Sequence, residues 1–206
     1  MTPSRRPAGR MPGFTLIEML ISLAIFSVVT GFTVANFRRG GQSDELRLAA
    51  DNVASAIRKA QTFALSGETA YVCSTTLAIC NPNVGGSCAG GSCGKTLPKG
   101  FGIHLSSASG DAHTMAFFAD TDGDRLYDAG ETISSQGVSP TPNVSVSFLA
   151  PISGSVLDIV FVPPKPRTYF NDAAADAVAT VTLQLRGTGQ AKSVKVNKVS
   201  GQISVE

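Results

Sequence analysis

The sequence has little net charge, and most of its small basic surplus lies at one end. Its 17 Lys and Arg residues against 15 Asp and Glu residues give a formal net charge of +2. Arg5, Arg6 and Arg10 all lie in the first thirteen residues, so the rest of the chain has 14 basic against 15 acidic residues, a net charge near −1. The net charge therefore gives no support to nucleic-acid binding.

Charge is almost absent from residues 14–37, where Glu18 is the only formally charged side chain. As a helix, the run would span about 36 Å at about 1.5 Å per residue, enough to cross a bilayer core of about 30 Å. A carboxylate in such a segment costs about 2.5–3.5 kcal/mol on insertion scales, so Glu18 requires a partner. Cleavage between Gly13 and Phe14 would create one, because the new α-amino group of Phe14 would lie one helical turn from Glu18.

Two other membrane interpretations fit parts of this segment. An ordinary secretory signal would use the three leader arginines and a weak cleavage site at Thr33-Val34-Ala35. However, Glu18 falls early in its apolar region, and that region is too long. A simple signal anchor explains the length and the flanking arginines but leaves Glu18 without a role. The sequence favours a membrane helix that begins at Phe14 after cleavage.

A second helical segment is predicted after the membrane run. Gly40 and Gly41 are weak helix formers that permit a bend, and Ser43 is the predicted N-cap of a new helix that stops at Gly67. Apolar residues recur at helical spacing on one face of this segment. They are Leu46, Ala50, Val53, Ile57, Ala60 and Ala64. We expect this face to pack on a globular head.

After Gly67 the sequence lacks any further helix-length segment and changes to short β-rich runs separated by turn residues. The predicted strands are 70–73, 101–105, 114–119, 132–136, 144–148, 156–162, 178–185, 193–196 and 202–205. Without crossover helices, antiparallel pairing is expected. The predicted fold class is α+β, with a leader at 1–13, a transmembrane and assembly helix at 14–39, an amphipathic helix at 40–66 and a β-rich head at 67–206.

The segment Gly13-Phe14-Thr15-Leu16-Ile17-Glu18, followed by Met19-Leu20-Ile21, resembles the class III signal of type IV pilins and type II secretion pseudopilins. The resemblance implies cleavage after Gly13 by a prepilin peptidase on the cytoplasmic face, followed by N-methylation of Phe14. It also implies that Glu18 pairs with the terminal amine of a neighbouring subunit. The implied partners are other pilin or pseudopilin subunits, and the inner membrane before assembly, with the head on the periplasmic side.

One long N-terminal helix followed almost wholly by strands is similar to the layout of the minor pilins and pseudopilins of the GspH/FimT family. Local similarities are Arg58-Lys59-Ala60-Gln61-Thr62-Phe63-Ala64, Tyr71-Val72-Cys73-Ser74 and the acidic turn that begins at Phe118. The family often has tryptophan near Gly100-Phe101-Gly102-Ile103, and this chain has none. Members linked to DNA capture carry a C-terminal Gly-Arg-x-Arg pattern, whereas this chain has Gly201-Gln202-Ile203-Ser204.

The resemblance implies a non-enzymatic subunit that initiates or tips a filament. The alternative is an adhesive or ligand-binding module, DNA uptake included, on a pilin-like anchor.

The twelve residues from Asp120 to Glu131 contain five carboxylates at the spacing of an EF-hand-like calcium loop. Loop positions 1, 3, 5, 9 and 12 are Asp120, Asp122, Asp124, Asp128 and Glu131. Position 6, normally glycine, is Arg125, and no flanking helices are predicted. The favoured interpretation is a solvated hairpin turn whose aspartates cap backbone amides, with calcium as the alternative and no other cofactor expected.

Four cysteines, Cys73, Cys80, Cys88 and Cys93, follow the membrane segment, and an even number on the oxidising side predicts disulfides. The expected pairs are Cys73 with Cys80 and Cys88 with Cys93, because both close short loops. The C-x6-C and C-x4-C spacings make a zinc site the weaker interpretation, with His104 and His113 as ordinary strand histidines.

The segment Gly90-Gly91-Ser92-Cys93-Gly94 formally matches the G-x-S-x-G motif of hydrolases. A nucleophile elbow needs a strand before the serine and a helix after it, and this glycine-rich loop predicts neither. We therefore expect no enzymatic activity.

Overall fold

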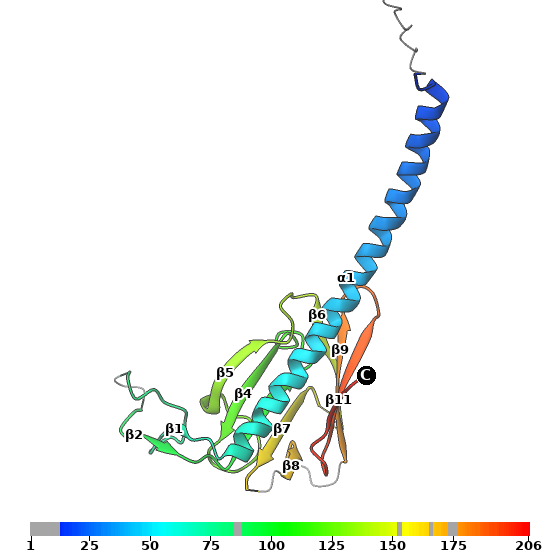
Figure 1. Ribbon diagram of the computed structural model, residues 1–206. Helices are drawn as coiled ribbons and strands as arrows, with labels where there is room; N and C mark the ends of the chain where they lie inside the picture. The colour runs from blue at the N-terminus through cyan, green and yellow to red at the C-terminus, as the bar shows by residue number, and fades with distance from the viewer. Residues whose placement is uncertain (1–12, 85–87, 152–153, 165–166, 173–176) are drawn as a thin grey trace, which may run out of the picture. The chain divides into compact units, whose positions relative to one another are not determined.

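The computed structural model describes residues 13–84, 88–151, 154–164, 167–172 and 177–206, with the backbone alone at residues 35 and 37–40. The chain divides into two compact units, Met1–Gly41 and Gln42–Glu206, each of which is described by itself. Helix α1 (Leu16–Ser66) contributes to both units (Figure 1). The prediction that a new helix starts at an N-cap on Ser43 is wrong, because α1 continues through Gly40 and Gly41. A helical glycine costs only about 1 kcal/mol relative to alanine, which the continuing hydrogen-bond ladder offsets.

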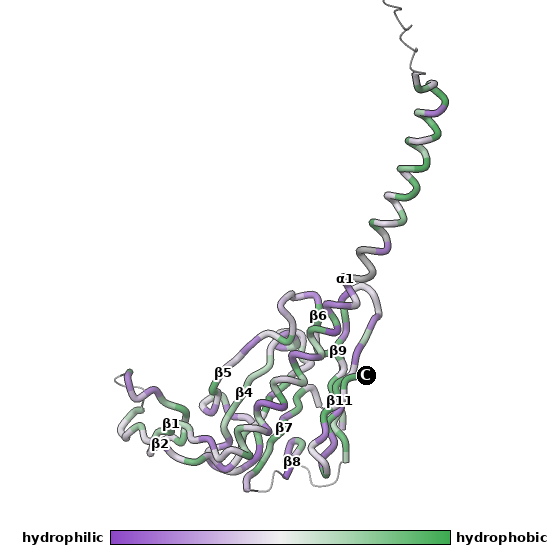
Figure 2. The backbone as a smooth tube through the Cα atoms, in the orientation of Figure 1, coloured by the Kyte–Doolittle hydropathy of each residue, from purple (hydrophilic) through white to green (hydrophobic). Residues whose placement is uncertain are grey.

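The first unit contains the helix segment expected to enter the membrane. Among the described residues, one helix is long and apolar enough to cross a bilayer, over Leu16–Val34. None of this segment is buried within the protein. Figure 2 shows its apolar colour along successive turns. Length and composition therefore agree with the membrane helix predicted from the sequence.

In the second unit, α1 lies against the sheets of the head (Figure 1). Its buried side chains follow the predicted helical spacing, and all belong to one core with the strands. They are Leu46, Ala49, Ala50, Val53, Ala54, Ala56, Ile57, Ala60 and Ala64. Because most of them are small, the helix can approach the sheets closely. Phe63 adds edge-to-face contacts with Phe101 and Phe117, at centroid distances of 5.6 and 5.2 Å.

The end of α1 is set by Gly67, whose φ of +63° places it in the left-handed conformation that ends many helices. The amide of Glu68 then donates to the carbonyl of Phe63, which lies in the last turn. The chain turns there into the first strand, as the sequence predicts.

The described residues of the head form three antiparallel sheets. The five-stranded sheet has the order β5-β4-β3-β7-β8, built from β3 (Gly100–Ser106), β4 (Thr114–Asp120), β5 (Thr132–Gly137), β7 (Val156–Val162) and β8 (Arg167–Phe170). The four-stranded sheet has the order β11-β10-β9-β6, built from β6 (Val144–Ala150), β9 (Val178–Leu185), β10 (Ala191–Asn197) and β11 (Ile203–Val205). The third sheet pairs β1 (Ala70–Cys73) with β2 (Cys93–Thr96). The α+β fold with antiparallel sheets is thereby confirmed.

The five-stranded sheet is covered on both faces. Phe101, Ile103 and Leu105 of β3 belong to the main core, with α1. The alternate residues Gly102 and His104 face the other way, as do Phe118 of β4 and Val160 of β7, since side chains of a strand alternate between faces. Phe118 and Val160 are nevertheless fully buried. A segment after β4 covers this outer face and forms the candidate site described below.

All nine predicted strands are present, and two further strands within the described residues were missed. β2 has the sequence Cys-Gly-Lys-Thr, which has no apolar alternation, and it is held by pairing with β1. β8 has four residues, Arg167–Phe170, and pairs with the edge of β7. Both are short strands stabilised by a neighbouring strand, which local sequence patterns do not reveal.

Candidate functional site

The predicted processing site lies at the start of the described chain. Gly13 and Phe14 precede α1, and Phe14 is 87% exposed. Glu18 is in the first turn, and its Oε2 accepts hydrogen bonds from the Thr15 amide (2.9 Å) and the Thr15 hydroxyl (2.8 Å). In return, the Glu18 amide donates to Thr15 Oγ1 (3.3 Å). This reciprocal arrangement is a capping box, with Thr15 as N-cap and Glu18 three residues later.

The capping role of Glu18 was missed in the sequence, although the signal was present as Thr15-x-x-Glu18. It has a direct chemical consequence. The carboxylate is held by the amide of Thr15, the residue next to Phe14, so it already lies at the chain end that cleavage would create. Glu18 thus caps the start of α1 in its own chain, and pairing with another subunit would be a second role of the same carboxylate.

The acidic segment forms the connection between β4 and β5, which pair as an antiparallel hairpin. Residues 120–131 are called the acidic loop below. The predicted hairpin is therefore present. Carboxylate oxygens of Asp120, Asp122 and Asp124 lie within 4.8 Å of one another. Asp128 and Glu131 are outside that group; Asp128 is exposed, and Glu131 lies in the short 3₁₀ helix η1 (Ala129–Glu131).

Each aspartate of the group also caps a backbone amide, as the hairpin interpretation predicts. Asp120 Oδ1 accepts from the Gly123 amide (2.6 Å), Asp122 Oδ1 from the Asp124 amide (3.0 Å) and Asp124 Oδ1 from the Leu126 amide (2.8 Å). Arg125, at the loop position where an EF-hand has glycine, has a φ of +64°. This is the left-handed conformation that glycine readily supplies at a sharp turn. The Arg125 guanidinium pairs with Asp172 at 2.6 Å and lies over the Tyr169 ring.

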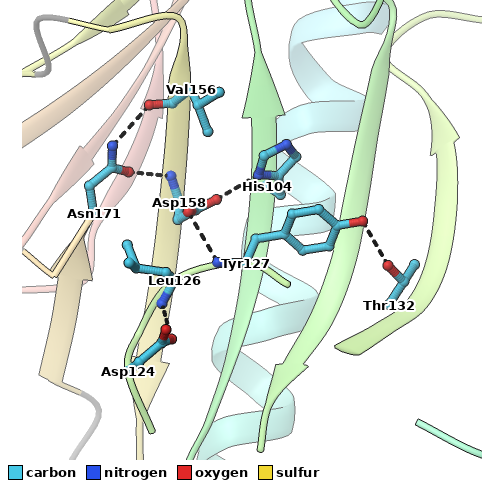
Figure 3. A network of polar contacts seen from close by, with 8 residues as sticks. All are labelled: His104, Asp124, Leu126, Tyr127, Thr132, Val156, Asp158 and Asn171. Carbon is cyan, nitrogen blue, oxygen red and sulfur yellow. Dashed lines mark hydrogen bonds and ion pairs between the residues drawn. The ribbon is translucent and has the colours of Figure 1, made fainter. Parts of the chain in front are cut away.

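A polar network attaches the acidic loop to the outer face of the sheet (Figure 3). The buried carboxylate of Asp158, on β7, lies 2.7 Å from His104 Nδ1 on β3 and accepts from the Tyr127 amide at 3.2 Å. The Tyr127 ring lies against the His104 ring and meets Phe118 edge to face. Its hydroxyl contacts Thr132 Oγ1 at 2.8 Å. Tyr127 is therefore the residue through which the loop covers this face.

Burial has a clear electrostatic effect on two carboxyls of the loop. Asp120 is fully buried, and desolvation raises its pKa to about 6; the Gly123 amide partly opposes this, and repulsion by Glu131, Asp122 and Asp124 adds to it. Burial also raises the pKa of Glu131, although hydrogen bonds from Thr121 favour its ionised form. Asp120 and Glu131 thus lie where water is largely excluded, and ionising them there is costly without a compensating group.

All four cysteines are paired, but with a different connectivity from the one expected. The disulfides are Cys73–Cys88 and Cys80–Cys93, with Cα distances of 5.4 and 6.0 Å. The expected pairs, Cys73 with Cys80 and Cys88 with Cys93, are wrong. Strand pairing places Cys73 opposite Cys93, and the chain between them folds back so that each bond joins residues far apart in the loop. We call residues 73–93 the disulfide loop.

The other candidate residues, Ser92, His113 and the cysteines, make hydrogen bonds or disulfides within the fold. Ser92 precedes strand β2 instead of a helix, and its amide donates to Ser74 Oγ, so the G-x-S-x-G segment is not a nucleophile elbow. His113 Nδ1 donates to the Val144 carbonyl at 2.9 Å. With every cysteine in a disulfide, none is available as a zinc ligand.

Comparison with known families gives a match at the N-terminus. Residues 10–34 match the model of the prokaryotic N-terminal methylation motif. Comparisons with curated proteins and with solved structures gave no significant match. The motif supports a type IV pilin-like or pseudopilin subunit, and it implies processing by a prepilin peptidase and assembly with other pilin subunits. With the apolar helix, it indicates membrane anchoring before assembly.

Proposed function

We propose that this chain is a minor type IV pilin or type II secretion pseudopilin of the GspH/FimT kind, a non-enzymatic filament subunit. The observation that carries the proposal is the lone carboxylate of Glu18 in an apolar run that matches the N-terminal methylation motif. Cleavage after Gly13 and methylation of Phe14 would produce a cationic chain end beside this carboxylate. A random acidic residue at this depth is disfavoured, whereas one that meets a cation has a reason to be there.

Assembly then depends on pairing between subunits. The Glu18 carboxylate of one subunit attracts the terminal amine of its neighbour within the apolar layer, and this fixes the axial register of adjacent helices. Such a pair contributes specificity even where its net stabilisation is small, because both charges lose hydration. The capping contacts with Thr15 keep the carboxylate oriented toward the chain end until a neighbour arrives.

The cysteines support a head outside the cytoplasm. Both disulfides lie in the unit that follows the membrane segment, and disulfides persist in oxidising compartments such as the periplasm. Before assembly, the helix anchors the subunit in the inner membrane with this head on the periplasmic side. The β-rich head, with its disulfide loop, suits a subunit that starts or tips a filament.

The proposal is tested by mass spectrometry of the full-length protein purified from a host with and without its prepilin peptidase. We expect the mature chain to begin at Phe14 and to carry one added methyl group only when the peptidase is present. Glu18→Gln should still be cleaved but should fail to enter filaments. Glu68→Gln, an exposed glutamate beyond α1, is the matched control and should assemble normally. A native chain that still begins at Met1, or that is trimmed after Ala35, contradicts the proposal.

An adhesive or ligand-binding module on a pilin-like anchor is the second candidate. It is favoured by the disulfide loop, which is covalently constrained and exposes the apolar side chains of Leu77 and Val84. Val84→Ser and Leu77→Ser should leave the filaments intact but abolish attachment if this candidate is right. If attachment is unchanged by both substitutions, the disulfide loop is not an adhesive surface.

A further inference from the structure

We propose that the acidic loop is a calcium-binding site, with Asp120, Asp122, Asp124 and Glu131 as its carboxylate ligands. The proposal concerns the head alone and does not depend on how the N-terminal helix is processed. Three of the four ligands already have oxygens within 4.8 Å of one another. Calcium binds six to eight oxygens, mostly from carboxylates and carbonyls, so a compact group of carboxylates is the chemistry it requires.

Clustered aspartates are common on protein surfaces, so the buried oxygens carry more weight. Asp120 is 0% exposed and Glu131 is 4% exposed. Asp120 Oδ2 and Glu131 Oε2 are both buried and accept no hydrogen bond from any described residue. A buried carboxylate oxygen without a donor is unfavourable, and a bound ion or water is one of the arrangements that satisfies such an atom in native structures.

Glu131 points into the loop from outside the group of aspartates. Its Oε1 accepts hydrogen bonds from the amide (2.6 Å) and the hydroxyl (2.7 Å) of Thr121, the residue between Asp120 and Asp122. Besides burial, repulsion by the Asp122 carboxylate also raises the pKa of Glu131, so the two charges are close enough to interact. The unpartnered Oε2 is therefore on a side chain held against the segment that carries the first two aspartates.

In the described part of the chain, no side-chain cation forms an ion pair with these carboxylates, although the Arg125 guanidinium attracts Asp120 from a greater distance. The ion pairs there involve none of the four carboxylates. Arg125 lies in the loop but pairs with Asp172. Lys99 lies over the loop, yet its ammonium donates to the backbone carbonyl of Asp122 at 2.7 Å. A divalent cation would supply the missing positive charge.

The spacing of the ligands selects calcium among the common cations. Asp120, Asp122, Asp124 and Glu131 are loop positions 1, 3, 5 and 12 of the EF-hand pattern. The sharp turn needed at position 6 is made by Arg125 in the left-handed conformation, so the missing glycine does not prevent it. The capping bonds use one oxygen of each aspartate and leave the other for a metal. A set of oxygen ligands without sulfur or imidazole disfavours zinc and copper.

The loop is also attached to the disulfide loop, so calcium would stabilise both. Thr121 Oγ1 donates to the Leu77 carbonyl at 2.6 Å, and the Ile79 amide donates to the Gly130 carbonyl at 2.7 Å. Ordering of the acidic loop by calcium is therefore expected to reduce amide exchange in residues 77–80.

The test is calorimetric titration of the full-length protein in detergent micelles with calcium chloride, and separately with magnesium chloride. We expect calcium to bind with a Kd of about 10⁻⁴ to 10⁻³ M, as in extracellular calcium modules, and magnesium to bind more weakly. As a second measurement, terbium bound in the loop should emit light when Tyr127 is excited, and calcium should displace it. Absence of heat and of terbium emission with calcium up to about 10 mM overturns the proposal. Equal affinity for magnesium overturns the assignment to calcium.

Two conservative variants test the ligands. Asp124→Asn keeps an oxygen for the Leu126 amide and Glu131→Gln keeps one for Thr121, so both should fold. Each should weaken calcium binding by at least about tenfold. Asp111→Asn, an exposed aspartate in the connection before β4, is the matched control and should bind as the wild type does. If Asp124→Asn and Glu131→Gln also bind calcium as the wild type does, the site lies elsewhere and the proposal is wrong.

Discussion

Replacing Asp120 by asparagine should stabilise the calcium-free protein at neutral pH. The ordinary pKa of the carboxyl is 3.8, and in the folded head burial raises it to about 6. The folded state therefore binds this proton more tightly than the unfolded state. Asp120 therefore makes its full stabilising contribution to the free energy of unfolding below pH 3.8. This contribution is lost as the pH rises through about 6.

The size of this destabilisation follows from the difference between the two pKa values of Asp120. At about 1.4 kcal/mol per pH unit, the difference between 3.8 and about 6 corresponds to roughly 3 kcal/mol of destabilisation when Asp120 is ionised. Asparagine carries no charge and keeps an oxygen for the Gly123 amide. That hydrogen bond becomes weaker, because its acceptor is no longer ionised. We therefore expect Asp120→Asn to gain about 1–3 kcal/mol at pH 7.5 in a chelator. The gain should disappear near pH 3.5, where the wild-type carboxyl is neutral.

The assay is thermal unfolding of the full-length protein in micelles, followed by near-UV circular dichroism. All three tyrosines (Tyr71, Tyr127 and Tyr169) lie in the head, so the signal reports its tertiary structure. Each kcal/mol should raise the Tm by about 2–4 °C for a head of this size. Asp111→Asn should show no such gain. If Asp120→Asn is less stable than the wild type at pH 7.5, or if its effect does not change with pH, the reasoning on burial is refuted.

Three further predictions concern the core, the disulfides and the helix start. Ile57→Ala, at a fully buried position of α1, should cost about 2–5 kcal/mol in thermal unfolding, whereas Leu48→Ala, at an exposed position of the same helix, should change stability little. Replacement of both Cys80 and Cys93 by serine should remove about 3 kcal/mol, since the bond closes a loop with a sequence separation of 13; non-reducing peptide mapping of the wild type should recover Cys80 joined to Cys93 and not to any other cysteine. Thr15→Val should weaken the helix cap by about 1 kcal/mol, seen as roughly fivefold faster amide exchange in the first turn, and Thr15→Ser should restore it. Unchanged exchange in Thr15→Val would show that the cap contributes nothing to the first turn.

Much of the fold followed from local patterns. The apolar run with Glu18 predicted the membrane segment, and helical spacing from Leu46 to Ala64 predicted the buried face of α1. The strands at 156–162 and 178–185 were predicted with their observed bounds. The spacing of the five carboxylates identified the acidic loop, and its place between two β-rich runs identified the hairpin. Each of these features depends on side chains close together in the sequence, so the sequence alone was sufficient.

The contacts between distant segments were decided only by the tertiary structure. The disulfide pairs depend on how the chain between β1 and β2 folds back, which loop length does not reveal. The His104–Asp158 pair joins residues of neighbouring strands that are far apart in the sequence. Tyr127 holds the acidic loop against the outer face of the sheet, and in the folded head Asp120 and Glu131 are buried while Asp122 and Asp124 of the same motif stay exposed. Spacing along the chain determines which side chains can share a loop, but packing between distant strands determines which of them lose their water.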